Sequence, residues 1–329
     1  MRVRTLGRST VPVTALGFGG ASIAGLYEPV DADTAAATVE AAWRQGVRFY
    51  DTAPHYGVGL SERRLGEALR AKPRADYTLS TKVGRLLVPP GGDGDDLRHG
   101  FASPGTYTRR WDFSADGVRR SIEESLERLG LDRIDVALIH DPDRHEEAAF
   151  REAYPALERL RAEGVVGAIG AGMNQAEMLA RFMKDTDVDA VLCAGRYTLL
   201  EQPALAELLP AASARGKSVI IGGVFNSGLL ADPAAPGATY NYAPVSDELR
   251  QRARRMEEIT RSYGVQLRTA ALNFPFGHPA VATVLAGARS TAEAADAAAA
   301  MRHPIPGQLW RQLREEGLLG ADVPVPGEY

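Results

Sequence analysis

Two patterns of apolar and polar residues alternate along the chain. Short runs rich in Val, Ile and Leu, typical of buried strands, are each followed by a longer segment with apolar residues at helical spacing. The strand-like runs lie at 13–19, 47–51, 78–83, 134–140, 166–172, 190–194, 218–224 and 281–287. The helical segments lie at 33–45, 61–71, 114–129, 145–163, 175–185, 203–215, 246–263 and 291–301. This alternation predicts an α/β protein with a parallel sheet.

The number of repeats points to a closed sheet. Eight strands, each followed by a helix, make a (β/α)8 TIM barrel, so we expect one barrel domain over residues 1–329. A doubly wound open sheet is the alternative, because periodicity does not report closure. Two connections, near 84–113 and 226–245, are unusually long. Their aromatic residues favour loops that cover an active site over disordered linkers.

Charge and composition narrow the class of partner. The chain has 38 Lys and Arg against 42 Asp and Glu, a net charge of -4, which favours a small-molecule substrate over nucleic acid or a membrane surface. Cys193 is the only cysteine, and its apolar neighbours predict an inert buried thiol. No apolar run is long enough for a membrane span, and we expect a cytoplasmic protein. These features do not predict an oligomeric state.

Four polar residues fall at the carboxyl ends of predicted strands. Asp51 ends the run 47–51, Tyr56 follows five residues later in DTAPHYG, Lys82 lies near the end of 78–83, and His140 ends 134–140. Barrel enzymes keep their reactive groups at this end of the strands. We therefore expect all four side chains on one rim, although any one of them alone could serve an ordinary structural role.

The four side chains also make chemical sense together. A tyrosine phenol has a pKa of about 10, and a neighbouring ammonium favours its phenolate form. Lys82 can supply that charge, Asp51 can keep Lys82 charged and oriented, and a neutral His140 can hydrogen-bond the substrate oxygen.

Three segments carry a family resemblance. GVRFYDTAPHYGVGLSERRLGEAL, LSTKVGR and LIHDPD resemble the signature regions of the aldo-keto reductase superfamily, and the resemblance extends over about 16–300. It implies a barrel oxidoreductase that uses a nicotinamide cofactor. It also implies that Asp51, Tyr56, Lys82 and His140 are the catalytic tetrad, with Tyr56 as acid in reduction and base in oxidation.

The cofactor is not expected on a Rossmann motif, because GxGxxG has only a near match before residue 23 and no helix follows it. Barrels tend to bind phosphate with the loops after strands seven and eight, which here read GGVFNSGLL and AGARSTAE. By resemblance to the family, the cofactor-binding residues are Asn174, Gly223, Phe225, Asn226, Ser227, Gly228, Gly287, Arg289, Ser290, Glu293 and Asp296. No metal site is expected.

Glu293 favours NAD over NADP. A carboxylate repels the 2'-phosphate of NADP and can accept a hydrogen bond from a free ribose hydroxyl. Arg289, four residues earlier, is the counterargument.

The segments HDPD, GGVFNSGLLA and FGHPAVATVLAGARS resemble the aldose 1-dehydrogenase branch of the superfamily. That branch implies NAD(P)-dependent oxidation of the C1 hemiacetal hydroxyl of an L-fucose or D-threo-aldose type sugar to the lactone. A pyridoxal 4-dehydrogenase activity and a general aldehyde reductase are the alternatives. Tyr27, Trp111 and Tyr240 are candidate pocket residues because they lie on the expected loops.

Other classes remain open from the residues alone. Lys82 could be the Schiff-base lysine of an aldolase. His140, Asp141, Asp143 and His145 cluster in sequence as metal ligands might, although Pro142 is expected to splay them. A nucleotide-sensing subunit with no turnover would keep the same fold.

Overall fold

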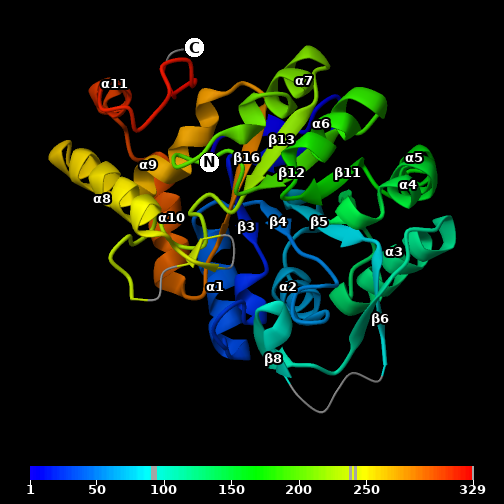
Figure 1. The fold of residues 1–329 in the computed structure, drawn as a ribbon. Coiled ribbons are helices and arrows are strands. Elements are labelled where there is room, and N and C mark those ends of the chain that lie inside the picture. Colours follow the sequence, from blue (N-terminus) through cyan, green and yellow to red (C-terminus); the bar gives the residue numbers. More distant parts are fainter. Residues whose placement is uncertain (90–94, 237–238, 241–242, 328–329) are drawn as a thin grey trace.

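The structure, a computed structural model, describes residues 1–89, 95–236, 239–240 and 243–327. Its centre is a closed barrel of eight parallel strands in the order β10-β11-β12-β13-β16-β3-β4-β5, so the open-sheet alternative is wrong (Figure 1). Closure is made by β16 against β3, where Leu285 pairs with Gly17. The strands are β3 (Leu16–Gly19), β4 (Phe49–Asp51), β5 (Thr78–Val83), β10 (Val136–His140), β11 (Ala168–Met173), β12 (Ala190–Ala194), β13 (Ser218–Gly222) and β16 (Val281–Gly287).

Helices surround the barrel and confirm the predicted alternation. Several begin at a side chain that accepts a backbone N–H, as Ser114 does from Gly117 at 3.0 Å, which satisfies a free donor of the first turn. The helices are α1 (Ala32–Arg44), α2 (Leu60–Leu69), α3 (Ala115–Leu129), α4 (Glu146–Ala148), α5 (Tyr154–Ala162), α6 (Ala176–Asp185), α7 (Leu208–Ala214), α8 (Asp247–Ser262), α9 (Leu267–Asn273), α10 (Thr291–Arg302) and α11 (Gly307–Glu315). Within the described ranges, no helix is long and apolar enough to cross a membrane.

The run predicted as one strand at 13–19 is two elements. Its first part belongs to β2 (Pro12–Thr14), which pairs antiparallel with β1 (Val3–Thr5), and only β3 enters the barrel. The hairpin closes one end of the barrel, because Leu6, Val11 and Val13 share a buried cluster with Phe49 and Leu138. The site must therefore lie at the other end, where the strands finish.

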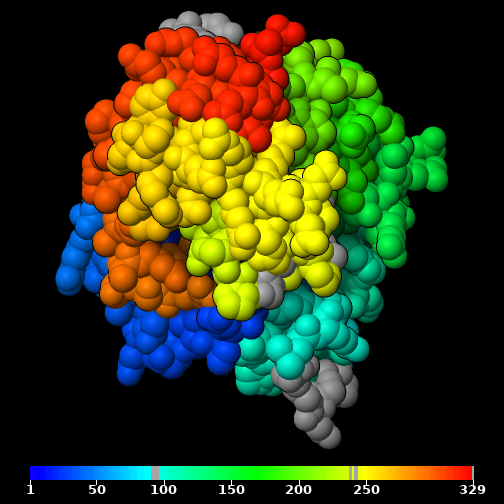
Figure 2. Space-filling model, turned by 60° about the vertical axis from the view of Figure 1, so that its left-hand side comes forward, coloured from blue at the N-terminus to red at the C-terminus, as the bar shows by residue number. Residues whose placement is uncertain are grey.

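The helix after the seventh strand also differs from the prediction. The segment predicted at 246–263 forms α8, but α9 is the helix that packs against α10, and α8 packs against α9 and α11 (Figure 1). Figure 2 shows α8, in yellow, and α11, in red, together on one face of the molecule. Sequence analysis missed α9 because it has only seven residues before Phe274 and Pro275.

The two long connections contain strands of their own. In the first, β6 (Arg85–Val88) pairs with β9 (Thr108–Trp111), and β7 (Asp95–Asp96) pairs with β8 (Phe101–Pro104). In the second, β14 (Thr239–Tyr240) pairs with β15 (Ala243–Pro244). Residues 90–94, 237–238 and 241–242 of these predicted loops lie outside the described part of the chain.

Gly66 makes the contact between α2 and α3 possible. A Cβ atom at this position would lie 1.9 Å from the backbone oxygen of Leu129 at the end of α3. We expect Gly66→Ala to lower the free energy of unfolding by about 1–3 kcal/mol, since the two helices must separate. The urea unfolding midpoint measures this loss.

Gly307→Ala is the matched control, because a Cβ at the start of α11 meets only the flexible end of Arg311 at 3.7 Å. We expect this variant to unfold at the wild-type midpoint or slightly above it, as helix propensity favours Ala. A Gly66→Ala protein as stable as Gly307→Ala would contradict the close-packing argument.

Candidate active site

The four residues predicted to act together do come together in the structure. Asp51, Lys82 and His140 lie at the carboxyl ends of β4, β5 and β10, which are neighbours in the barrel. Tyr56 follows in the turn between β4 and α2. The strand order therefore places all four on one arc of the rim.

A buried ion pair forms the centre of this arc. The Nζ atom of Lys82 donates to Oδ2 of Asp51 at 2.7 Å and to the backbone oxygen of Thr52 at 2.8 Å. The hydroxyl of Ser80 donates to the other oxygen of Asp51 at 2.6 Å. Lys82 is 1% exposed and Asp51 is 2% exposed, so the pair is held away from solvent.

The charge state of Lys82 follows from these contacts. Burial alone lowers the pKa of this ammonium, but the attraction of Asp51 and the contact with Tyr56 outweigh it and raise the pKa above its usual value. A lysine that forms a Schiff base must first be neutral. The aldolase alternative for Lys82 is therefore not favoured.

Tyr56 is in direct contact with that ammonium. Its side chain is hydrogen-bonded to Lys82, whose Nζ lies 4.7 Å from the centre of the phenol ring. Burial raises the pKa of Tyr56, while Lys82 lowers it as expected, and burial prevails. At neutral pH, Tyr56 is thus a protonated phenol beside a charged ammonium.

His140 is a neutral imidazole at the same place. Its ring stands edge-on to Tyr56, with ring centres 5.8 Å apart. Burial, followed by the charges of Arg85 and Lys82, holds its pKa well below the usual range. Its Nδ1 atom is buried and has no hydrogen-bond partner among the described residues.

Sequence analysis missed an ion pair next to His140. Arg85, at the start of β6, pairs with Asp141, whose Oδ2 lies 3.6 Å from Nε2 of His140. Burial raises the pKa of Asp141 even though Arg85 opposes the shift. The sequence presents Asp141 as part of the HDPD segment and as a possible metal ligand, and neither feature reveals this ion pair. No group of three or more possible metal ligands occurs among the residues that the structure places.

A second missed network lies beside Tyr56. The Nε–H of Arg109, from β9, donates to Nδ1 of His55 at 2.6 Å, and its Nη1 donates to Asp96 at 2.7 Å. The ring of His55 lies 5.6 Å from that of His140 and 5.6 Å from that of Phe101. The DTAPHYG motif contained His55, but its partners are far away in sequence.

The three predicted pocket residues have different neighbours. Trp111 lies under Arg85, with the guanidinium carbon 4.3 Å from its ring centre, and stacks on Phe113. Tyr27 has a positive φ of 70° and its hydroxyl is hydrogen-bonded to Ser227. Tyr240 packs against the hydrophobic core from β14. Of these three residues, Trp111 is the one in contact with Arg85, whose partner Asp141 lies beside His140.

The loop after β13 has an unusual backbone. Gly223, Asn226, Ser227 and Gly228 all have positive φ, and a Cβ on Gly228 would meet nothing within 4 Å. Asn226 is buried and donates through Nδ2 to Glu201 at 3.3 Å, while its Oδ1 has no partner in the described chain. Phe225 packs against the core and anchors the loop.

The loop after β16 is rich in charge. Gly287 ends the strand, and Ser290 caps α10 by accepting the N–H of Glu293 at 3.2 Å. Arg289 pairs with Glu28 at 2.7 Å and with Glu293 at 3.2 Å.

Asp296 and Asn174 are the remaining two predicted cofactor residues. Asp296 is held by Arg268 through two bonds, at 2.7 and 2.8 Å, which raise the pKa of that guanidinium. Asn174 follows β11 and is half-buried.

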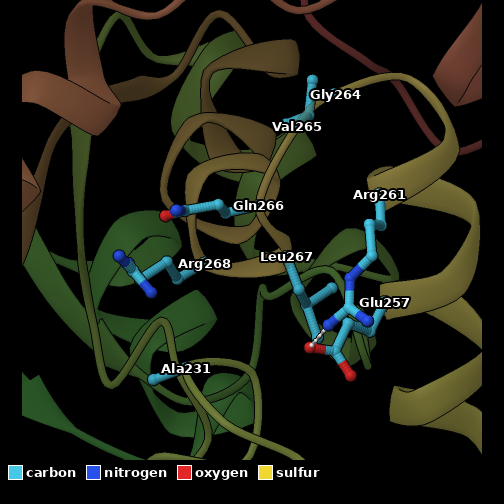
Figure 3. Close-up of a pocket in the computed structure, with 8 residues that line it drawn as sticks. All are labelled: Ala231, Glu257, Arg261, Gly264, Val265, Gln266, Leu267 and Arg268. Atoms are coloured by element: carbon cyan, nitrogen blue, oxygen red, sulfur yellow. Dashed lines mark hydrogen bonds and ion pairs between the residues drawn. The ribbon is translucent and has the colours of Figure 1, made fainter.

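A separate cavity of about 350 Å³ opens between α8 and α9 (Figure 3). Arg261 turns to Glu257 on one side, with the two charges 2.8 Å apart, and Arg268 extends on the other side. Because Arg268 is paired with Asp296, the positive charges of this cavity are already neutralised. The cavity does not include the tetrad.

Comparisons with known proteins agree with this geometry. Residues 15–316 match the aldo/keto reductase family. A D-threo-aldose 1-dehydrogenase of a Pseudomonas species is 45% identical over 93% of this chain and 95% of its own length. A pyridoxal 4-dehydrogenase of Microbacterium luteolum is 39% identical over 96% and 97% of the two chains.

A solved aldo-keto reductase of Bacillus halodurans has the same fold, with a TM-score of 0.77, 26% identity and 98% of both chains covered. The closed barrel and the family match over most of the chain lead to one assignment. The chain belongs to the aldo/keto reductase family and is an NAD(P)-dependent oxidoreductase.

Proposed function

We propose that this protein, as a single barrel domain, oxidises the C1 hemiacetal hydroxyl of an aldose of the L-fucose or D-threo type to a lactone, with NAD as cofactor. The observation that carries the proposal is the contact of Tyr56 with a buried, charged Lys82. The similarity to the D-threo-aldose 1-dehydrogenase over nearly the whole chain supports the choice of substrate.

In this mechanism Tyr56 takes the proton of the C1 hydroxyl. Its phenolate form is stabilised by Lys82, and Asp51 keeps Lys82 protonated and in place. Neutral His140 hydrogen-bonds the reacting oxygen and fixes its approach. The bound nicotinamide supplies the acceptor for the C1 hydride. In the reverse direction Tyr56 returns its proton to a carbonyl.

The sign of the pH dependence follows from Tyr56. Burial keeps the pKa of its phenol above the usual value in the free protein, so the base form becomes more populated as pH rises. The rate of oxidation should therefore rise toward alkaline pH, and reduction should be favoured at pH values below the pKa of Tyr56.

The residues after β13 and β16 fit a dinucleotide. Gly223 and Gly228 are exposed, the open space around Gly228 permits a close approach by phosphates, and the unpartnered Oδ1 of Asn226 offers a buried acceptor. The capped start of α10 at Ser290 lies at the next loop. We assign Phe225, Ser227 and Gly287 to the same surface and Asn174 to the carboxamide.

The preference for NAD rests on Arg289. This guanidinium would have to bind the 2'-phosphate of NADP, but it already forms ion pairs with Glu28 and Glu293. The carboxylate of Glu293 also adds repulsion. Asp296, the other predicted carboxylate of α10, is paired with Arg268.

A pyridoxal 4-dehydrogenase activity is the second candidate. Trp111, Phe113 and His145 form a group of stacked and tilted rings, with Trp111 and His145 centred 5.1 Å apart. Such a group suits a flat aromatic substrate. A general aldehyde reductase is the remaining alternative.

Side-by-side assays with NAD test the substrate. We expect kcat/KM for L-fucose to exceed that for pyridoxal by about tenfold or more, because a pocket that hydrogen-bonds the several ring hydroxyls of a sugar leaves polar groups unpaired against the flat pyridine ring. The opposite ranking would support the pyridoxal activity. Inactivity with both would leave the general aldehyde reductase.

Comparing kcat/KM for NAD and NADP tests the cofactor. We expect the wild type to prefer NAD and Glu293→Gln to use NADP about tenfold better, because a charge that repels phosphate and occupies Arg289 is removed. Glu315→Gln, an exposed change on α11, is the matched control. A strong wild-type preference for NADP would contradict the assignment.

A further inference from the structure

His55 lies at the reacting centre, but the mechanism above does not use it. Its ring is 6.2 Å from that of Tyr56 and 5.6 Å from that of His140, measured between ring centres. The residue is half-buried, so it is not sealed inside the protein.

Arg109 fixes the tautomer of His55. A guanidinium only donates, so Nδ1 of His55 must accept the Nε–H of Arg109 at 2.6 Å. A neutral imidazole has one proton, which must then lie on Nε2. Arg109 also donates to the backbone oxygen of His55 at 2.7 Å, which holds the ring and the turn together.

Asp96 fixes Arg109 in turn. The two side chains are 7% and 3% exposed and are joined through both carboxylate oxygens. Asp96 lies on β7 and Arg109 on β9, so the strands inserted after β5 hold His55 from outside the barrel. A histidine that a buried ion pair holds in place is pre-organised as a hydrogen-bond donor to a ligand.

The charge of His55 does not change over the working range. Burial, followed by the charges of Arg85 and Arg109, lowers the pKa of its imidazole to about 2. His55 is therefore a permanent neutral donor, unlike a histidine that switches near neutral pH.

We propose that the Nε2–H of His55 hydrogen-bonds the hydroxyl on the carbon next to the reacting carbon, and so selects aldoses that carry a C2 hydroxyl. This inference rests on the proposed aldose oxidation. Tyr56 and His140 both hold the reacting oxygen, and the ring of His55 adjoins both of theirs. An oxygen bound by His55 then lies close to C1, and the C2 hydroxyl is the hydroxyl group nearest to C1 that can accept this hydrogen bond.

The test compares L-fucose with 2-deoxy-L-fucose. We expect the wild type to prefer L-fucose in kcat/KM, and His55→Leu to lose about tenfold on L-fucose with little change on the deoxy sugar. The ratio of the two sugars is measured within one variant and does not depend on how much of it folds. Quenching of protein fluorescence by NADH checks cofactor binding.

Two further variants separate selection from support of the loop. His55→Gln places an amide N–H near the position of Nε2, and we expect it to keep most of the preference for L-fucose. The exposed His99 also contacts His55, with ring centres 5.8 Å apart. His99→Leu therefore disturbs the same surroundings without removing the donor. We expect its preference to equal that of the wild type.

The outcomes that overturn the proposal differ from the failure of the aldose function. An active wild type without preference, an unchanged ratio in His55→Leu, or an equal loss in His99→Leu would reject the role of His55 alone. A wild type inactive on both sugars would reject the proposed aldose oxidation and the role of His55 with it.

Discussion

The buried ion pair between Lys82 and Asp51 is the interaction on which the site depends. Two charges removed from water are costly unless their remaining donors and acceptors are satisfied. Here the backbone oxygen of Thr52 accepts a second hydrogen bond from the ammonium, and Ser80 donates to the second carboxylate oxygen. These partners lie at the end of β4 and on β5, so pairing these two strands and building the ion pair are one requirement.

Burial, helped by the positive charge around this pair, keeps the two histidines of the rim neutral. Arg85 and Lys82 help to keep His140 neutral, and Arg85 with Arg109 does the same for His55. The arginines are tolerated because Asp141 and Asp96 neutralise them. The rim therefore presents neutral donors to a substrate and keeps its full charges in pairs behind them.

Backbone strain gathers at the same end of the barrel. In the described part of the chain, the residues other than glycine with positive φ are Tyr27, Val58, Asp141, Asn226 and Ser227. All five follow the carboxyl ends of barrel strands, and such conformations persist where the surrounding contacts impose them. Sequence motifs marked several of these loops without revealing their conformation.

Local patterns in the sequence predicted the barrel and the positions of the tetrad, because strand ends and helix periods are properties of short segments. Three strands, β5, β12 and β16, have the predicted bounds. The contact between Arg109 and His55 joins residues 54 apart, and no local pattern predicts such a pair. The short α9 was missed for a related reason, since its place in the ring depends on packing against α10.

The central claim is that Tyr56, next to Lys82, is the group that transfers the proton. The most direct measurement is kcat/KM for L-fucose oxidation in Tyr56→Phe, with NADH binding measured on the same protein and the half-exposed Tyr107→Phe as control. The account predicts a loss of at least about 10²-fold in Tyr56→Phe, with cofactor binding retained and Tyr107→Phe unaffected. Turnover near the wild-type value in Tyr56→Phe would contradict it.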